Sequence, residues 1–208
     1  MSEQSIITPN KPIVCIIAAI ALSGEAKNPV GVFGYKGDLP WRGKVPEDME
    51  RFRKETMGNT VMMGRCTYYS IDEKYRPLRG RRNVVLSSQQ IEEGGVEFYK
   101  TLSNALQREY ELGVKRVFII GGKRPIQEAL KRGIVDEVYL TIIHKDYAPE
   151  NGLMLGNPDE HGYTLFNQLT DLSQYYTEME QVGLNKVVTS ATSGIEMEFK
   201  TYFRKKIE

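Results

Sequence analysis

The chain has 208 residues, of which 40% are hydrophobic and 26% are charged, and its formal net charge is +1. This length favours one domain over two small ones, and the composition is that of an ordinary globular protein rather than of a basic nucleic-acid binder. No apolar run is long enough to cross a bilayer as a helix. We therefore expect neither a membrane nor a nucleic acid among its partners, and predict an N-terminal extension over residues 1–12 and one domain over residues 13–208.

The cysteines and histidines favour a reduced, metal-free protein. Cys15 and Cys66 are far apart and belong to no CxxC pair, and only His144 and His161 could join a metal site. We expect a cytoplasmic protein with free thiols, no metal and a monomeric state.

The first predicted element is a buried strand. Residues 13–20 form a short, unbroken, β-branched run, which is typical of a central strand covered on both faces. A long glycine-containing loop follows it. A helix then begins at Pro46, because proline suits a first turn and the acids Glu47 and Asp48 complement the helix dipole.

This helix should end near Met57, before Gly58. Its helical spacing predicts an inward face formed by Met49, Phe52 and Thr56. The solvent face is predicted to consist of Glu50, Arg51, Arg53, Lys54 and Glu55.

Strands and helices alternate over the next part of the chain. We predict strands at residues 59–63, 83–87, 97–99, 116–120 and 137–143. Helical segments are predicted at residues 67–71, 102–112 and 125–132. This alternation indicates an α/β fold with a mainly parallel sheet flanked by helices.

The C-terminal part has a different pattern. Residues 174–182 and 195–204 alternate with a period of two, which predicts an antiparallel hairpin, and the last segment is typical of a half-exposed edge strand. The sheet is therefore predicted to be mixed, within a single domain. The connection over residues 145–173 has no clear pattern.

Ligands of open α/β sheets bind beyond the carboxyl ends of the parallel strands. Gly64 to Thr67 lies at such an end, where free N–H groups and Arg65 could hold phosphate, although a capped turn with a solvated arginine would look the same. The paired glycines Gly121 and Gly122 permit close approach of a dinucleotide, or serve only tight packing.

Two further residues are ambiguous when each is considered alone. Trp41, the only tryptophan, could belong to a ligand lid or could anchor a packed loop. Asp48 could be an active-site acid or an exposed charge in a first helical turn.

The motifs taken in order resemble those of dihydrofolate reductases over residues 13 to about 141. The matching segments are Ile17-Ala-Ala19, Gly34 with Leu39-Pro-Trp41, Pro46-Glu-Asp48 with Phe52 and Thr56, Val61 to Thr67, Ser70-Ile71, Leu78-Arg-Gly-Arg81, Asn83 to Ser88, Ile120-Gly-Gly122 and Tyr139-Leu-Thr141. An ordered set of this length is highly specific.

The resemblance implies an NADPH-dependent reductase that transfers a hydride to C6 of 7,8-dihydrofolate while N5 gains a proton. It implies that Asp48 is the active-site acid and that Trp41 and Leu39 shield the site from water. The substrate-binding residues that it implies are Ile17, Ala19, Asp48, Met49, Phe52, Ser70, Ile71, Leu78, Arg81, Ile120 and Thr141.

The resemblance also implies an NADPH site, in which Arg65, Ser87 or Ser88, and Arg124 contact the 2′-phosphate and the Gly121-Gly122 bond is cis. The implied cofactor-binding residues are Ala19, Gly34, Leu39, Gly64, Arg65, Cys66, Thr67, Leu86, Ser87, Ser88, Ile120, Gly121, Gly122, Lys123, Arg124 and Ile126. Cys66, Lys123 and Ile126 depart from the residues common in the family.

Two other functions stay open at this point. A reductase of riboflavin synthesis shares a Gly-Gly cofactor turn, but Leu39-Pro-Trp41 together with Asp48 argues against it. A catalytically silent NADPH-binding protein is the alternative from another class, since fold does not guarantee activity.

Overall fold

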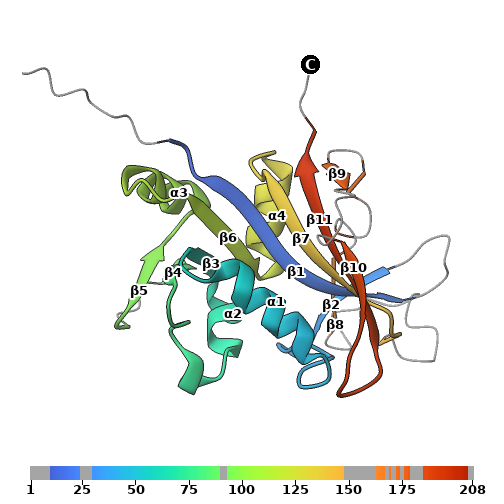
Figure 1. Cartoon of the computed structure of the whole chain (residues 1–208). Helices are drawn as coiled ribbons and strands as arrows, with labels where there is room; N and C mark the ends of the chain where they lie inside the picture. The colour runs from blue at the N-terminus through green and yellow to red at the C-terminus, as the bar shows by residue number, and fades with distance from the viewer. Residues whose placement is uncertain are drawn as a thin grey trace, which may run out of the picture.

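The computed structural model describes residues 10–23, 30–89, 93–147, 163–166, 169, 172–173, 176–178 and 185–205. They form one mixed sheet with helices on both faces (Figure 1). Its parallel part consists of β1 (Ile13–Ser23), β3 (Thr60–Gly64), β4 (Arg82–Leu86), β5 (Val96–Tyr99), β6 (Arg116–Gly121) and β7 (Glu137–Ile143). The antiparallel additions are β2 (Val30–Tyr35), β8 (Tyr163–Leu165), β9 (Tyr176–Glu178), β10 (Lys186–Thr189) and β11 (Glu196–Arg204).

The strand order is β10-β11-β7-β1-β6-β3-β4-β5. β1 lies in the middle, pairs in parallel with both β6 and β7, and is buried on both faces, as its unbroken apolar sequence predicts. Its side chains alternate between two hydrophobic clusters: Val14 and Ile16 belong to one, and Cys15 and Ile17 to the other.

The helices are α1 (Pro46–Thr56), α2 (Arg65–Ser70), α3 (Leu102–Glu111) and α4 (Lys123–Lys131), with a short 3-10 turn, η1, at Glu73–Tyr75. α3 and α4 pack on the face that contains Val14 and Ile16. α1 and α2 pack on the other face, and Figure 1 shows α1 in front of the sheet and α4 behind it. The predicted parallel α/β architecture is confirmed, with the ends of its helices and parallel strands within about three residues of those expected.

Two strands were missed by the sequence interpretation. β2 lies in the segment predicted to be a loop and pairs with β1, and β8 lies in the segment without a clear pattern and pairs with β2. Gly31 and Gly34 interrupt the apolar alternation of β2, and β8 has only 3 residues, so neither produces the usual strand signal.

The C-terminal hairpin exists, but its first strand was misplaced. β11 pairs with β10, which follows the segment at 174–182, while within that segment only β9 is described, and it pairs with the end of β11. Residues 174–175 and 179–182 lie outside the described residues. The prediction that β11 is an edge strand is wrong, because β7 pairs along its other side. Its alternation reflects one face that packs on the core and one that meets solvent.

A buried ion pair joins α3 to the sheet and predicts a large stability effect. Glu109 has no exposed surface, and its carboxylate accepts hydrogen bonds from Arg82 Nε at 3.0 Å and from Thr60 Oγ1 at 2.6 Å. Arg82→Met should lower the free energy of unfolding by about 2–3 kcal/mol, because it leaves a buried carboxylate short of a donor. Urea unfolding measures this.

The matched control is Arg108→Met, which breaks the Arg108–Glu111 pair on the surface of the same helix. Its effect should stay below about 0.5 kcal/mol. Equal losses in both variants would contradict the role given to Arg82.

Candidate active site

The centre of the candidate site is the carboxyl group of Asp48, in the first turn of α1. Asp48 is only 9% exposed, although it was ambiguous as a helix-start acid in the sequence. Burial raises the pKa of this carboxyl, while a hydrogen bond with the Thr141 side chain and the positive charge of Arg51 lower it. Burial has the largest effect, so the pKa of Asp48 lies above its ordinary value.

Apolar side chains line the sheet beside Asp48. Ile17 of β1 and Phe118 of β6 belong to one cluster with Tyr139 of β7. Against it pack Phe52 of α1, Ile71, Leu78 and Ile120. The structure thus gathers five of the implied substrate residues, Ile17, Phe52, Ile71, Leu78 and Ile120, on one face.

Trp41 and Leu39 belong to the neighbouring cluster. Trp41 is 1% exposed and packs with Ala19 and Val45, and its ring centroid lies 5.8 Å from that of Tyr147. The loop that carries it touches α2, since Arg42 donates to the Ser70 backbone oxygen at 3.2 Å and pairs with Asp38. The structure therefore shows Trp41 as a packed anchor of a loop that contacts α2, and its role in a ligand lid stays a prediction.

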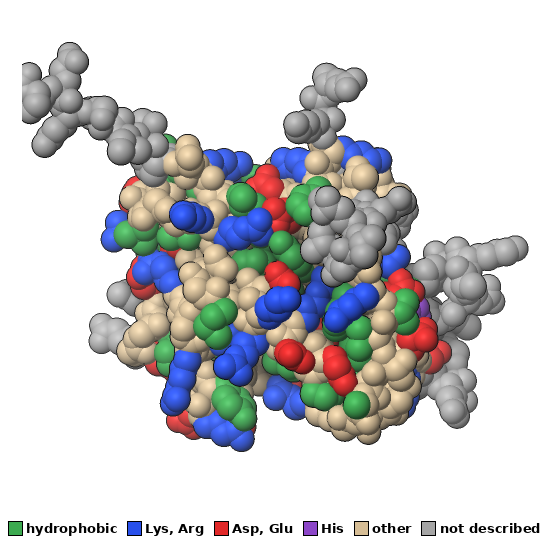
Figure 2. Space-filling model, in the orientation of Figure 1, with side chains coloured by type: hydrophobic (Ala, Val, Ile, Leu, Met, Phe, Trp, Pro, Cys, Tyr) green, Lys and Arg blue, Asp and Glu red, His purple; other side chains and the backbone are tan. Residues whose placement is uncertain are grey.

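Arg81 lies at the opposite end of α1 from Asp48. Its Nη1 donates to Thr56 Oγ1 at 3.2 Å, and its guanidinium lies 5.6 Å from the centroid of the Phe52 ring. Burial and the nearby charge of Arg53 lower the pKa of Arg81. An acid thus lies in the first turn of α1, and the Arg81 cation contacts the last turn of the same helix. The face that carries α1 shows Lys and Arg side chains beside hydrophobic ones (Figure 2).

The two glycine-containing turns predicted for a cofactor lie side by side. A Cβ atom on Gly122 would approach Thr67 Oγ1 to 3.0 Å, and one on Gly64 would lie 3.5 Å from Pro125 Cγ. The Gly121-Gly122 bond is cis, as the resemblance implied. A Cβ atom at Gly121 or Gly122 would come within 3.0 Å of the Thr67 side chain, so glycine lets this backbone lie close against the start of α2.

The polar residues expected around the cofactor lie near these turns. Arg65 hydrogen-bonds to Gln89, whose backbone N–H donates to Ser87 Oγ at 3.1 Å. This contact brings α2 to the end of β4, and no sequence motif pointed to Gln89. Cys66, Ser88, Lys123 and Arg124 are exposed or partly exposed.

Four other implied residues have structural contacts. Ser70 Oγ donates to the Thr67 backbone oxygen at 2.8 Å, and Gly34 is paired with Thr164 of β8. Leu86 packs against the main core cluster from β4. Ile126 belongs to that cluster and has no exposed surface, so its side chain supports α4 from within.

The prediction of which α1 side chains point inward is partly wrong. Met49 is 53% exposed, whereas Arg51, predicted to be on the solvent side, donates hydrogen bonds to Leu140 and Lys200 in β7 and β11. The inward face is centred on Asp48, Arg51 and Phe52 rather than on Met49. Hydrophobic spacing misplaced it, because two of the inward side chains are charged.

The structure has no group of three potential metal ligands among the described residues, and none of its described helices is long and apolar enough to span a membrane.

The family model described as dihydrofolate reductase matches residues 16–180. The chain belongs to the dihydrofolate reductase family. The dihydrofolate reductase of Mycobacterium leprae is 41% identical over 129 residues, which cover 58% of this chain and 73% of that protein. That of Mus musculus is 30% identical over 208 residues, with 94% and 98% covered.

Two further comparisons differ in how much of the other protein the match covers. A bifunctional dihydrofolate reductase-thymidylate synthase of Paramecium tetraurelia is 39% identical over 113 residues, and the match covers 54% of this chain but 23% of that protein. The structure of the Enterococcus faecalis dihydrofolate reductase complexed with NADP(H) and RAB-propyl aligns with a TM-score of 0.68 at 21% identity, covering 94% of this chain and 98% of that one. The predicted fold is thereby confirmed.

The raised pKa of Asp48 predicts a pH-dependent stability effect. A carboxyl whose folded pKa exceeds its unfolded pKa costs no stability below the unfolded value, and the cost grows as pH rises from the unfolded pKa to the folded pKa. The stability of Asp48→Asn relative to the parent should therefore rise between pH 4 and pH 8. Urea unfolding at several pH values measures this difference.

Asp72→Asn is the control with the opposite sign. Asp72 accepts a hydrogen bond from the Lys74 N–H at 3.1 Å, which lowers the pKa of its carboxyl. Its contribution to stability is lost as pH falls, so the relative stability of this variant should decline with rising pH. A flat difference for Asp48→Asn across the range would mean that burial does not disfavour its charge.

Proposed function

We propose that this chain reduces 7,8-dihydrofolate to 5,6,7,8-tetrahydrofolate with NADPH, by hydride transfer to C6 and protonation at N5. The observation that carries the proposal is the buried carboxyl of Asp48, which faces Thr141 and lies next to an apolar surface suited to a flat ring. Family membership supports the same reaction.

The two ends of α1 match the two ends of the substrate. Dihydrofolate has a donor-rich amidine edge on its pterin ring and carboxylates on its glutamate tail. Asp48 can accept from the pterin edge, and Arg81 can pair with a tail carboxylate in a planar contact. About 12 Å of helix axis separates Asp48 from Thr56, the partner of Arg81. Phe52 lies between them on the same helix and packs with the apolar cluster.

The chemistry assigned to the chain is the handling of one proton. The raised pKa lets Asp48 hold a proton closer to neutral pH than an ordinary aspartate can, and the site can pass that proton towards N5. Trp41 and Leu39 exclude water from the neighbouring region, which strengthens the hydrogen bonds of Asp48. Met49, exposed beside the helix start, is proposed to contact the pterin only when substrate is bound.

NADPH supplies the hydride, and the residues present fit it. Gly121 and Gly122 form with Thr67 a closely packed backbone cradle, in which an added Cβ atom would come within 3.0 Å of the Thr67 side chain. The starts of α2 and α4 at this cradle offer free backbone N–H groups, and Arg65, Ser87, Ser88 and Arg124 offer donors for the 2′-phosphate. The other proposed contacts are Ala19, Gly34, Leu39, Gly64, Cys66, Leu86, Ile120, Lys123 and, through its support of α4, Ile126.

The proposed cellular setting follows from the thiols and the charge of the chain. Cys15 and Cys66 are both free thiols, which fits the reducing cytoplasm. We propose a monomer that acts on small molecules and binds neither membranes nor nucleic acids, in keeping with the net charge of +1. No metal is proposed.

One substitution tests the role of Asp48. Asp48→Asn should lower turnover of dihydrofolate at pH 7 by about 100-fold or more, because the site loses its proton donor, while NADPH affinity stays unchanged. Absorbance of NADPH follows the reaction, with dihydrofolate, folate and a riboflavin precursor as competing substrates.

Each outcome of this assay decides between functions. The parent protein should consume NADPH with dihydrofolate and not with the riboflavin precursor. Consumption with neither compound would favour a silent binder. Undiminished turnover in Asp48→Asn would contradict the proposal that Asp48 supplies the proton.

A second substitution tests the cofactor site. Arg65→Ala should weaken NADPH binding by about 10- to 100-fold, because a charge-assisted hydrogen bond to phosphate is lost, and should leave NADH binding nearly unchanged. Fluorescence titration measures both affinities. Arg132→Ala, which removes a surface arginine paired with Glu128, is the control and should change neither. Equal weakening of NADPH and NADH by Arg65→Ala would refute the contact with the 2′-phosphate.

A further inference from the structure

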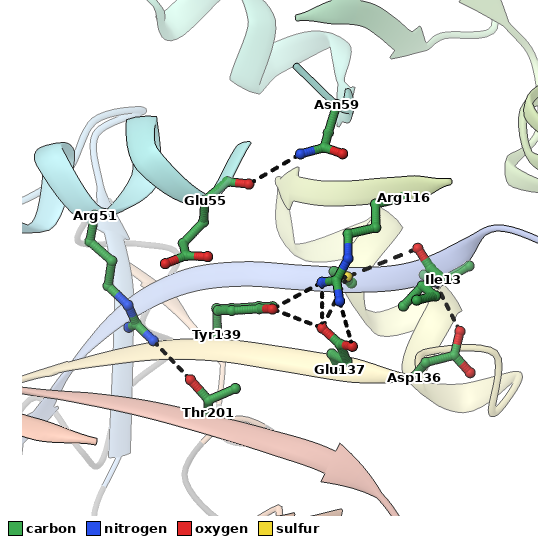
Figure 3. A network of polar contacts seen from close by, with 11 residues as sticks. Ile13, Arg51, Glu55, Asn59, Arg116, Asp136, Glu137, Tyr139 and Thr201 are labelled. Atoms are coloured by element: carbon green, nitrogen blue, oxygen red, sulfur yellow. Dashed lines mark hydrogen bonds and ion pairs between the residues drawn. The ribbon is translucent and has the colours of Figure 1, made fainter. Parts of the chain in front are cut away.

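Arg51 is a partly buried arginine that lies one turn after Asp48 on α1. Its Nη1 donates to the Leu140 backbone oxygen at 2.9 Å and to Thr141 Oγ1 at 3.2 Å. Its Nη2 donates to the Lys200 backbone oxygen at 2.8 Å and to Thr201 Oγ1 at 3.4 Å. The side chain therefore joins α1 to β7 and β11, and Figure 3 shows it reaching down from the helix to the sheet.

Aromatic rings hold the guanidinium in this position. Its central carbon lies 4.8 Å from the centroid of the Phe199 ring and 5.9 Å from that of Tyr139. Burial lowers the pKa of Arg51, whereas Asp48, Glu55 and Tyr139 raise it. Because a guanidinium is the most basic of the titratable side chains, it remains charged near neutral pH. The fold thus places a permanent cation inside the site.

Thr141 connects this cation to the acid. The Thr141 oxygen accepts a hydrogen bond from Arg51, and the Thr141 side chain also hydrogen-bonds to the Asp48 carboxyl. A hydroxyl has one hydrogen to donate. The Arg51 guanidinium can only donate, so it occupies a lone pair of the Thr141 oxygen. The hydroxyl hydrogen of Thr141 is therefore available to donate to the Asp48 carboxyl.

We propose that Arg51 is a positioning residue for Asp48, which fixes the Thr141 hydroxyl as a donor to the carboxyl and favours its ionised form. This effect of Arg51 on the Asp48 carboxyl is a property of the protein without bound ligands. Its consequence for catalysis rests on the proposed dihydrofolate reduction.

The charges around this pair are few and mostly neutralised. On α1, Glu55 lies on the Arg51 side, and on β7 Tyr139 is hydrogen-bonded to Arg116 and Glu137, as Figure 3 shows. On β11, the Lys200 ammonium lies 3.3 Å from Glu198, and on β10 Lys186 lies over the Phe199 ring. Among the described residues, Arg51 is the cation that lowers the pKa of Asp48.

Removal of Arg51 should change the pKa of Asp48 in one direction. Without Arg51 the Asp48 carboxyl keeps the effect of burial and loses a stabilising charge, so its pKa rises further. Because the protonated acid is the form proposed to supply the proton, turnover falls as pH rises through this pKa. Removal of Arg51 should therefore move the high-pH decline of turnover to higher pH.

The test is a titration of the Asp48 carboxyl by ¹³C NMR in free protein, with its resonance assigned through Asp48→Asn. Arg51→Met should raise the pKa of Asp48 by about one unit. Lys54→Met removes an exposed charge from the same helix and should change this pKa by less than about 0.2 unit, because solvent screens it. Turnover against pH should shift in parallel for Arg51→Met alone.

Two further variants keep the test decisive. Arg51→Gln retains an amide donor without charge and should raise the pKa as Arg51→Met does, which carries the test if the methionine variant does not fold. Arg51→Lys restores charge and should return the pKa at least halfway. An unmoved pKa in a folded neutral variant, or equal shifts in Arg51→Met and Lys54→Met, would overturn the inference. NMR needs no turnover, so a parent protein without dihydrofolate turnover would reject the proposed function separately.

Discussion

The burial of one carboxyl group, that of Asp48, is the constraint on which the arrangement of the site depends. A carboxylate that leaves water must receive hydrogen bonds or opposite charge, or it takes up a proton. Thr141 in β7 and Arg51 in α1 supply part of this compensation. The same arginine reaches the backbone of β11, so the C-terminal strand holds in place an acid that lies about 150 residues earlier in the chain.

The sheet order explains why the acid and the cofactor turns belong to one site. β1 pairs with β7, which contains Thr141, on one side and with β6, which ends at Gly121, on the other. β3 and β4 continue the sheet, so that Gly64 and Leu86 are paired at the same end. The glycine turns beside Thr67 and the apolar surface beside Asp48 thus lie on strands that β1 joins in the middle of the sheet.

The sequence predicts those parts of the molecule whose signals are local. The β-branched run of β1, Pro46 at the start of α1 and the glycine pair at the end of β6 all appear where expected, because strand burial, helix initiation and tight turns depend on neighbouring residues. Arg51 and Met49 were predicted on the wrong faces of α1. Hydrophobic spacing assigns an arginine to the solvent side, because it contains no information about the hydrogen-bond acceptors that β7 and β11 offer to Arg51. The pairing of β11 with β10 and with β7, like that of β2 with β8, depends on contacts distant in sequence, which a single chain pattern does not record.

The most direct test of the role of Asp48 is a crystal structure of the protein with NADP⁺ and folate bound. We expect the Asp48 carboxyl to contact the amidine edge of the pterin, with the nicotinamide near Ile120 and the pyrophosphate against Thr67, Gly121 and Gly122. Arg81 should contact a carboxylate of the glutamate tail. A pterin bound away from Asp48, or a dinucleotide bound away from the two glycine turns, would contradict the proposed site.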